Sequence, residues 1–120
     1  MTIKEAHEGL TNKKFSATEL TEEILKKIDR DDKDIHAYLK VDEEGSLNTA
    51  KLVDRNISEG VDIDPLAGIP VAIKDNILVK GQQATAASQI LKDYIASYDA
   101  TVSKRLRDQN AILIGKTNLD

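Results

Sequence analysis

The segment GIPVAIKDN, Gly68–Asn76, decides how this part of the chain folds, because an unbroken apolar run leads directly into a lysine. Ile69–Ile73 has the length and composition of a strand buried on both faces and is too short for a helix. Lys74 then leaves that strand at its carboxyl end. Loss of water penalises the charged form of an amine, so a lysine held there is a candidate general base. The plainer alternative is that Lys74 marks where the strand meets water.

Helical patterns precede this strand. A first helix is predicted by three apolar residues at helical spacing, Ile3, Ala6 and Leu10, and by a polar stretch over 11–14 that ends it. Ser16 and Glu19 form a capping box, and an apolar stripe follows, so a second helix is predicted over about 17–30. The acidic run Asp29–Asp34 is interpreted as a solvated turn that breaks the helix, since it lacks the glycine and the distal glutamate of a calcium loop.

Strands and helices then alternate. Imperfect alternation predicts a strand over 35–41, and a third helix is predicted by Leu47, Ala50, Val53 and Ile57, with Gly60 closing it. After the lysine strand, a helix is predicted from Asp99 to about Gln109, with Asn110 in a left-handed C-terminal position. A fully apolar strand follows over 111–114. Helices between strands that are apolar on both faces predict an α/β layer structure with a largely buried sheet.

Composition narrows the classes of function. The 120 residues carry a net charge of −4, which disfavours direct binding of a nucleic-acid backbone. The basic cluster Lys104–Arg107 is interpreted as a solvated helix face. His7 and His36 lie on different predicted elements without a third ligand, so no metal site is expected. Gly115–Thr117 lacks the upstream glycine of a phosphate loop, so no nucleotide or other cofactor site is expected here.

Neither export nor disulfide chemistry is indicated. The chain has no cysteine, which fits a reducing cytoplasm. It has no apolar stretch near the roughly 20 residues that a membrane helix needs, and no secretory signal follows Met1. We therefore expect a cytoplasmic protein without a membrane partner.

The segment Pro65–Asn76 resembles the lysine motif of the amidase signature family. A second set of residues agrees with that family in order and spacing: Gly81, Thr85–Ser88 and Ile90–Leu91. Ala84 departs from it, since a second threonine is common at that position. The ending Ala111–Asp120 is similar to the strand and turn that come next in bacterial members. The resemblance spans nearly the whole chain, but only residues 65–120 are specific.

The resemblance implies an α/β/α layered fold with a mixed, largely buried sheet. It also implies that residues 1–120 are the N-terminal fragment of a single amidase domain, with helices over about 2–60 and a lysine-bearing strand region over about 65–120. The family uses one lysine and two serines, and the only counterpart here is Lys74. The serines of this chain are scattered singly, at Ser16, Ser46, Ser58, Ser88, Ser97 and Ser103. We therefore expect the serine-bearing part downstream and the fragment alone to be inactive.

Within the family, the ending GKTNLD is similar to bacterial members that hydrolyse glutamine and supply its ammonia to a tRNA-dependent amidotransferase. That likeness implies glutamine as substrate, other subunits as partners and tRNA reached only through a partner. ATP and Mg are expected at the partner subunit, which would convert Glu-tRNA(Gln) to Gln-tRNA(Gln), and none is expected on this chain. Two alternatives stay open: a stand-alone amide hydrolase, and a non-catalytic interaction module in which Lys74 is structural.

Overall fold

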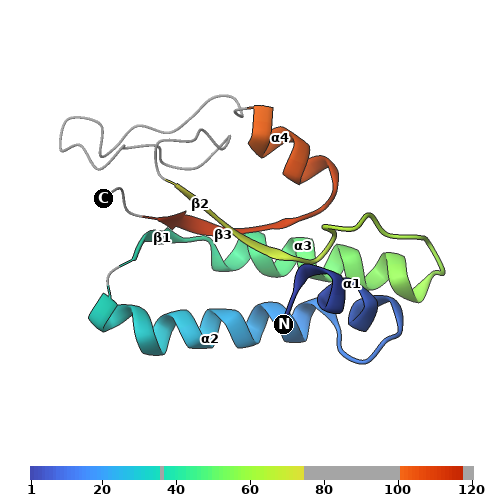
Figure 1. Cartoon of the computed structure of the whole chain (residues 1–120), viewed down its shortest axis with the longest axis horizontal. Helices are drawn as coiled ribbons and strands as arrows, with labels where there is room; N and C mark the ends of the chain where they lie inside the picture. The colour runs from blue at the N-terminus through green and yellow to red at the C-terminus, as the bar shows by residue number, and fades with distance from the viewer. Residues whose placement is uncertain (36, 75–100, 118–120) are drawn as a thin grey trace.

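A computed structural model describes residues 1–35, 37–74 and 101–117 (Figure 1). The elements in chain order are α1 (Ile3–Thr11), α2 (Ala17–Ile35), β1 (Tyr38–Val41), α3 (Glu43–Ser58), β2 (Pro70–Lys74), α4 (Thr101–Asp108) and β3 (Ile112–Thr117). The alternation of helices and strands confirms the predicted α/β class. None of the helices within the described ranges is both long and apolar enough to cross a bilayer.

The sheet is mixed, as the family resemblance implies. Its three strands in the described residues are ordered β1-β3-β2, with β1 antiparallel and β2 parallel to β3. In Figure 1, α2 and α3 lie on one side of the sheet and α4 lies on the other. The latest of these three strands in the sequence is therefore the middle strand of the sheet.

Alternate residues of β3 serve two cores. Ile112 and Ile114 join a cluster with Leu10, Ala50 and other apolar side chains of α1 and α3, whereas Leu113 packs with Ile73, Val71 and Leu106 on the opposite face. Successive strand residues point to opposite faces, so this division follows from the apolar run itself. The layered arrangement buries β3 on both sides, as predicted for 111–114.

Backbone turns between the helices use the residues that favour them. Gly60 has φ +77° and ends α3, and Asn110 has φ +62° after α4, so both predicted left-handed positions are confirmed. Gly68 has φ +76°, and a Cβ there would lie 3.1–3.3 Å from Leu10, Ala17 and Val53. This glycine is required twice, by its backbone conformation and by the close approach of three core side chains.

The N-terminus of α2 is capped from two directions. The Ser16 hydroxyl accepts from the Glu19 amide at 2.9 Å, which confirms that half of the predicted capping box. The carboxylate of Asp54, on α3, accepts from the amides of Ala17 at 2.6 Å and Thr18 at 3.0 Å and from the Thr18 hydroxyl at 2.6 Å. Donors that a helix leaves unpaired at its start are thus satisfied across the α2–α3 interface.

The prediction that the acidic run breaks α2 was wrong, because the helix continues to Ile35. The run contains no glycine or proline, and each aspartate costs only a fraction of a kcal/mol in a helix interior. Two of its carboxylates also form an ion pair or hydrogen bonds in the folded chain. Asp31 pairs with Arg30 at 2.9 Å, and Asp32 accepts from the amides of Ala37 and Tyr38 just beyond the helix. The first strand consequently begins at Tyr38 rather than at residue 35.

The two strands near the lysine also depart from prediction. β3 extends through Gly115, where a turn was expected, to Thr117. β2 has the predicted position, but it is not buried on both faces: Ile73 is buried, Ala72 and Lys74 are exposed, and Pro70 and Val71 are half-buried. Within the described residues β2 is an edge strand, and α3 and α4 both pack against β3, the middle strand.

Candidate functional site

Lys74 is the last residue of β2 and is exposed in the described part of the chain. Because β2 and β3 are parallel, their carboxyl ends meet at one edge of the sheet. In open α/β sheets, ligands bind outside the carboxyl ends of parallel strands. The strand exit predicted from the sequence is therefore a position where an amine can meet a substrate, although the expected burial of Lys74 is not found among these residues.

Three residues define this edge, and we call Lys74, Lys116 and Thr117 the lysine edge. Lys74 is opposite Thr117 in the β2–β3 register, and Ile73 is opposite Lys116. The Thr117 hydroxyl donates to the carbonyl oxygen of Ile73 at 3.5 Å. A side chain of β3 thus contacts the peptide that leads into the candidate base.

Lys116 is completely buried, with an exposed fraction of 0%, although it is charged and near the end of a strand. Its antiparallel neighbour on β1 is Lys40, which is exposed. Sequence reasoning missed its burial, because Gly115–Thr117 was considered as a rejected phosphate loop and as part of the GKTNLD ending, and not as strand. The available signal was its place at the end of an apolar run that continues as strand, where a long side chain packs inward.

The β1 side of the lysine edge is tightly packed. Gly115 lies so close to the carbonyl oxygen of Lys40 that a Cβ would collide with it, so the two strands could not approach in this way with a larger residue. Tyr38, opposite Thr117, is half-buried, and burial together with the nearby Asp32 carboxylate raises the pKa of its phenol.

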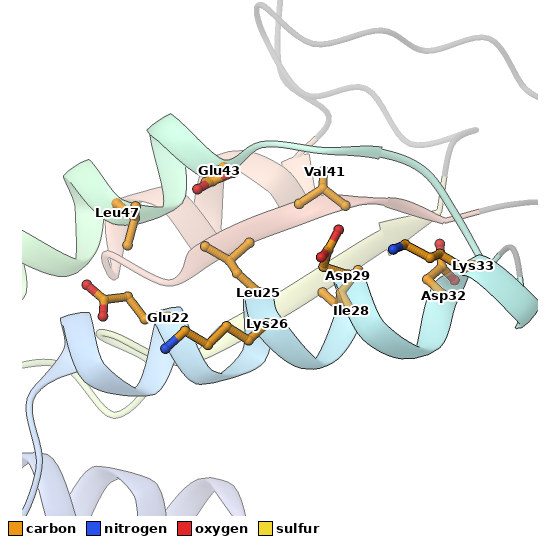
Figure 2. A pocket seen from close by; sticks show the side chains of 10 residues that line it. All are labelled: Glu22, Leu25, Lys26, Ile28, Asp29, Asp32, Lys33, Val41, Glu43 and Leu47. Atoms are coloured by element: carbon orange, nitrogen blue, oxygen red, sulfur yellow. The ribbon is translucent and has the colours of Figure 1, made fainter.

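An open groove of about 850 Å³ lies elsewhere, between α2 and the segment formed by β1 and the start of α3 (Figure 2). Its lining residues are Glu22, Leu25, Lys26, Ile28, Asp29, Asp32, Lys33, Val41, Glu43 and Leu47. Apolar side chains stand between carboxylates and ammonium groups. Among the described residues that line it there is no serine, threonine, cysteine or histidine.

Other residues considered from the sequence do not join the lysine edge. His7 lies on α1, and no group of three potential metal ligands occurs in residues 1–35, 37–74 and 101–117. The basic cluster on α4 is exposed, and Lys104 pairs with Asp108 at 2.9 Å, as a solvated helix face requires. Several residues lie outside the described ones: His36, Asp75, Asn76, Gly81, Ala84, Thr85–Ser88, Ile90–Leu91, Ser97, Asp99 and Asn118.

The described serines do not supply a nucleophile on the strands. Ser16 caps α2, and the Ser58 hydroxyl donates to the carbonyl of Arg55 within α3. Ser46 and Ser103 are buried in α3 and α4. None of these four residues is on β2 or β3, so the lysine edge presents two lysines and a threonine hydroxyl without a serine of its own.

Known proteins share both the sequence and the fold of this chain. The family model described as Amidase matches residues 19–120. The chain belongs to the amidase family. This amidase chain is 43% identical over 120 residues to the A subunit of the glutamyl-tRNA(Gln) amidotransferase of Desulforudis audaxviator (strain MP104C), covering 100% of the chain and 24% of that protein. It is 44% identical over 118 residues to the same protein of Cyanothece sp. (strain PCC 7425 / ATCC 29141), covering 98% of the chain and 24% of the relative.

Solved amidase structures share the fold. The native peptide amidase from Stenotrophomonas maltophilia superimposes with a TM-score of 0.93 at 30% identity, covering 99% of this amidase chain and 25% of that one. The amidase chain therefore spans about a quarter of the length of these relatives. Its layered α/β fold with a mixed sheet is that of amidase-signature enzymes, as the sequence resemblance implies.

Proposed function

We propose that the full-length protein is the A subunit of a glutamyl-tRNA(Gln) amidotransferase and hydrolyses glutamine to supply ammonia. The observation that carries this proposal is the 43% identity over all 120 residues to a protein of that name. The exit of Lys74 at the carboxyl end of a parallel strand supports it, because the amine is placed where a substrate can reach it.

In this proposal Lys74 is the ultimate base. Its neutral amine accepts a proton relayed through a middle serine from a nucleophilic serine, both expected beyond the residues of this chain. The serine oxygen bonds to the carboxamide carbon of glutamine, the carbon–nitrogen bond breaks, and ammonia leaves with the transferred proton. Water then cleaves the acyl-enzyme ester, which releases glutamate and restores the serine.

The ammonia would pass to a partner subunit that activates the glutamyl group of Glu-tRNA(Gln) with ATP and Mg. This chain would bind neither the nucleotide nor the tRNA, in keeping with its net charge of −4. The assembly would work in the cytoplasm. A partner is thus part of the proposal, because ammonia released without one would be lost to solvent.

A second candidate function is amide hydrolysis without partners. The 30% identity and TM-score of 0.93 to a peptide amidase favour it, since that relative shares the same part of the fold. Identity to the amidotransferase relatives is higher over the same residues, so we place this function second. The two candidates use the same base and differ in the substrate and in the need for partner subunits.

The experiment compares the full-length protein alone and with its partner subunits. Glutamine hydrolysis, and amidation of Glu-tRNA(Gln) with ATP, are measured for the native protein, for Lys74→Ala and for Lys40→Ala, which removes an exposed lysine from β1. Partner-dependent amidation that is lost only in Lys74→Ala is the expected result. Hydrolysis of peptide amides without partners would instead establish the second function, and normal activity of Lys74→Ala would remove the proposed base.

A further inference from the structure

The β2–β3 register shifts by one residue just before the lysine edge. Val71 is opposite Leu113, but the next residue of β2, Ala72, is opposite Gly115. Ile114 is the extra residue of β3. Such irregularities re-aim the side chains that follow them and are frequent beside active sites.

The shift decides which residue faces Lys74. Continued without it, the register would place Lys74 directly opposite Lys116, on one face of the sheet. The observed register places Lys74 opposite Thr117 and Lys116 opposite Ile73. Because residues that follow one another along a strand alternate between faces, the two lysines leave the sheet on opposite sides. Their burial agrees, since Lys116 is fully buried and Lys74 is exposed.

In this register, Thr117 contacts the backbone of β2. Its hydroxyl donates to the carbonyl oxygen of Ile73 at 3.5 Å, and that carbonyl belongs to the peptide bond that continues into Lys74. In the described residues β2 pairs with β3 alone, so contacts from β3 hold its carboxyl end. The bond joins positions that are 44 residues apart in sequence, and helical or turn geometry does not impose it.

We propose that Thr117, brought opposite Lys74 by the register shift at Ile114, is a positioning residue for the base. It does not touch substrate and acts by fixing the peptide that carries Lys74. This inference rests on the proposed function, because it assumes that Lys74 accepts a proton.

The test compares Thr117→Val with Thr117→Ser in the full-length protein with its partner subunits. Valine keeps the branched shape and removes the hydroxyl, whereas serine keeps the hydroxyl. We expect Thr117→Val to lower kcat for glutamine hydrolysis roughly tenfold, because misplaced catalytic groups lose rate steeply with distance, while KM stays within about twofold. Thr117→Ser should recover most of the rate. Thermal unfolding of both variants shows whether the same folded protein is compared.

The outcomes distinguish a failure of the positioning role of Thr117 from a failure of the proposed role of Lys74 as base. Normal kcat in Thr117→Val, with Lys74→Ala inactive, would overturn the positioning role and leave the proposed function intact. Equal losses in the valine and serine variants would also overturn it, since the hydroxyl would then be irrelevant. Activity in Lys74→Ala would refute the base itself. A rise in KM equal to the whole loss of kcat/KM would show that Thr117 serves substrate binding instead.

Discussion

The helical layer, α1 to α3, and the lysine edge differ in the burial and the partners of their charged side chains. In the helical layer a half-buried carboxylate, Asp54, satisfies three donors at the start of α2. At the lysine edge one ammonium group is wholly buried and another, one strand away, is exposed. Burial of a charged group costs several kcal/mol unless its partners compensate, so the burial of Lys116 depends on the contacts that its side chain makes. We expect this division to extend to function, with the helical layer contributing mainly to stability and the lysine edge to the proposed catalysis.

Replacement of Lys74 gives the largest effect and tests this division directly. We expect Lys74→Ala to lower glutamine hydrolysis by the full-length protein roughly a thousandfold or more, since removal of a base disables the relay that depends on it. The free energy of unfolding should change by less than about 0.5 kcal/mol, because Lys74 is exposed. Steady-state kinetics and urea unfolding measure the two quantities. A large loss of stability would mean that Lys74 belongs to the structural region.

Gly68→Ala should produce the largest loss of stability in the helical layer. Its φ of +76° strains any side chain, and a Cβ would press on Leu10, Ala17 and Val53. We expect about 3 kcal/mol of destabilisation from strain and overpacking together. Gly60→Ala is the matched control, since φ is +77° there but no atom lies within 4 Å of a Cβ, and about 1 kcal/mol is expected. Equal costs in urea unfolding would show that packing contributes nothing.

Asp54→Asn sharpens the same comparison with a smaller effect. One of the two carboxylate oxygens becomes an amide that cannot accept, so a donor of Ala17 or Thr18 loses its partner. We expect a loss of about 1 to 2 kcal/mol in urea unfolding, as for other helix caps, with unchanged kcat for glutamine. Asp62→Asn, in the exposed connection after α3, is the control and should be neutral. Changed kinetics in Asp54→Asn would couple the helical layer to the lysine edge.

Tyr38 borders both regions and should give the smallest effect. Burial, aided by Asp32, raises the pKa of its phenol in the folded chain above that in the unfolded chain. Ionisation therefore favours unfolding, and this contribution to stability is complete below the ordinary pKa of about 10 and is lost as the pH rises through the folded value. Urea unfolding between pH 8 and 11 measures it. Tyr38→Phe should decline less steeply over that range, and an identical decline would mean that Tyr38 ionises normally.

Sequence patterns predicted the helical layer well because its signals are local. Ser16 and Gly60 act through neighbouring backbone, and each was found where its residue type indicated. The cap from Asp54 could not be predicted, since it crosses 37 residues to reach Ala17. The end of α2 was misplaced because the charged run was interpreted as a solvated turn. Asp32 instead finds donors beyond the helix.

At the lysine edge, the sequence predicted the strand position of Lys74 but not the residues that lie beside it. The apolar run predicted the strand that carries Lys74, and burial of Ile73 agrees with it. Exposure of Ala72 among the described residues depends on which elements cover that face of β2, a long-range property that the run does not encode. The burial of Lys116 and the opposition of Lys74 and Thr117 depend on a register shift, which no single strand reveals.

The order of strands also constrains how the molecule forms during synthesis. β1 and β2 have no contact with each other in the sheet of the described residues, and both pair with β3, which is made after them. Helices α1 to α3 can associate as soon as they emerge, since N-terminal segments fold first on the ribosome. Within the described sheet, β1 and β2 can pair only after β3 has been synthesised. The position that we infer to orient the base is thus also among the later ones of this region to join the sheet.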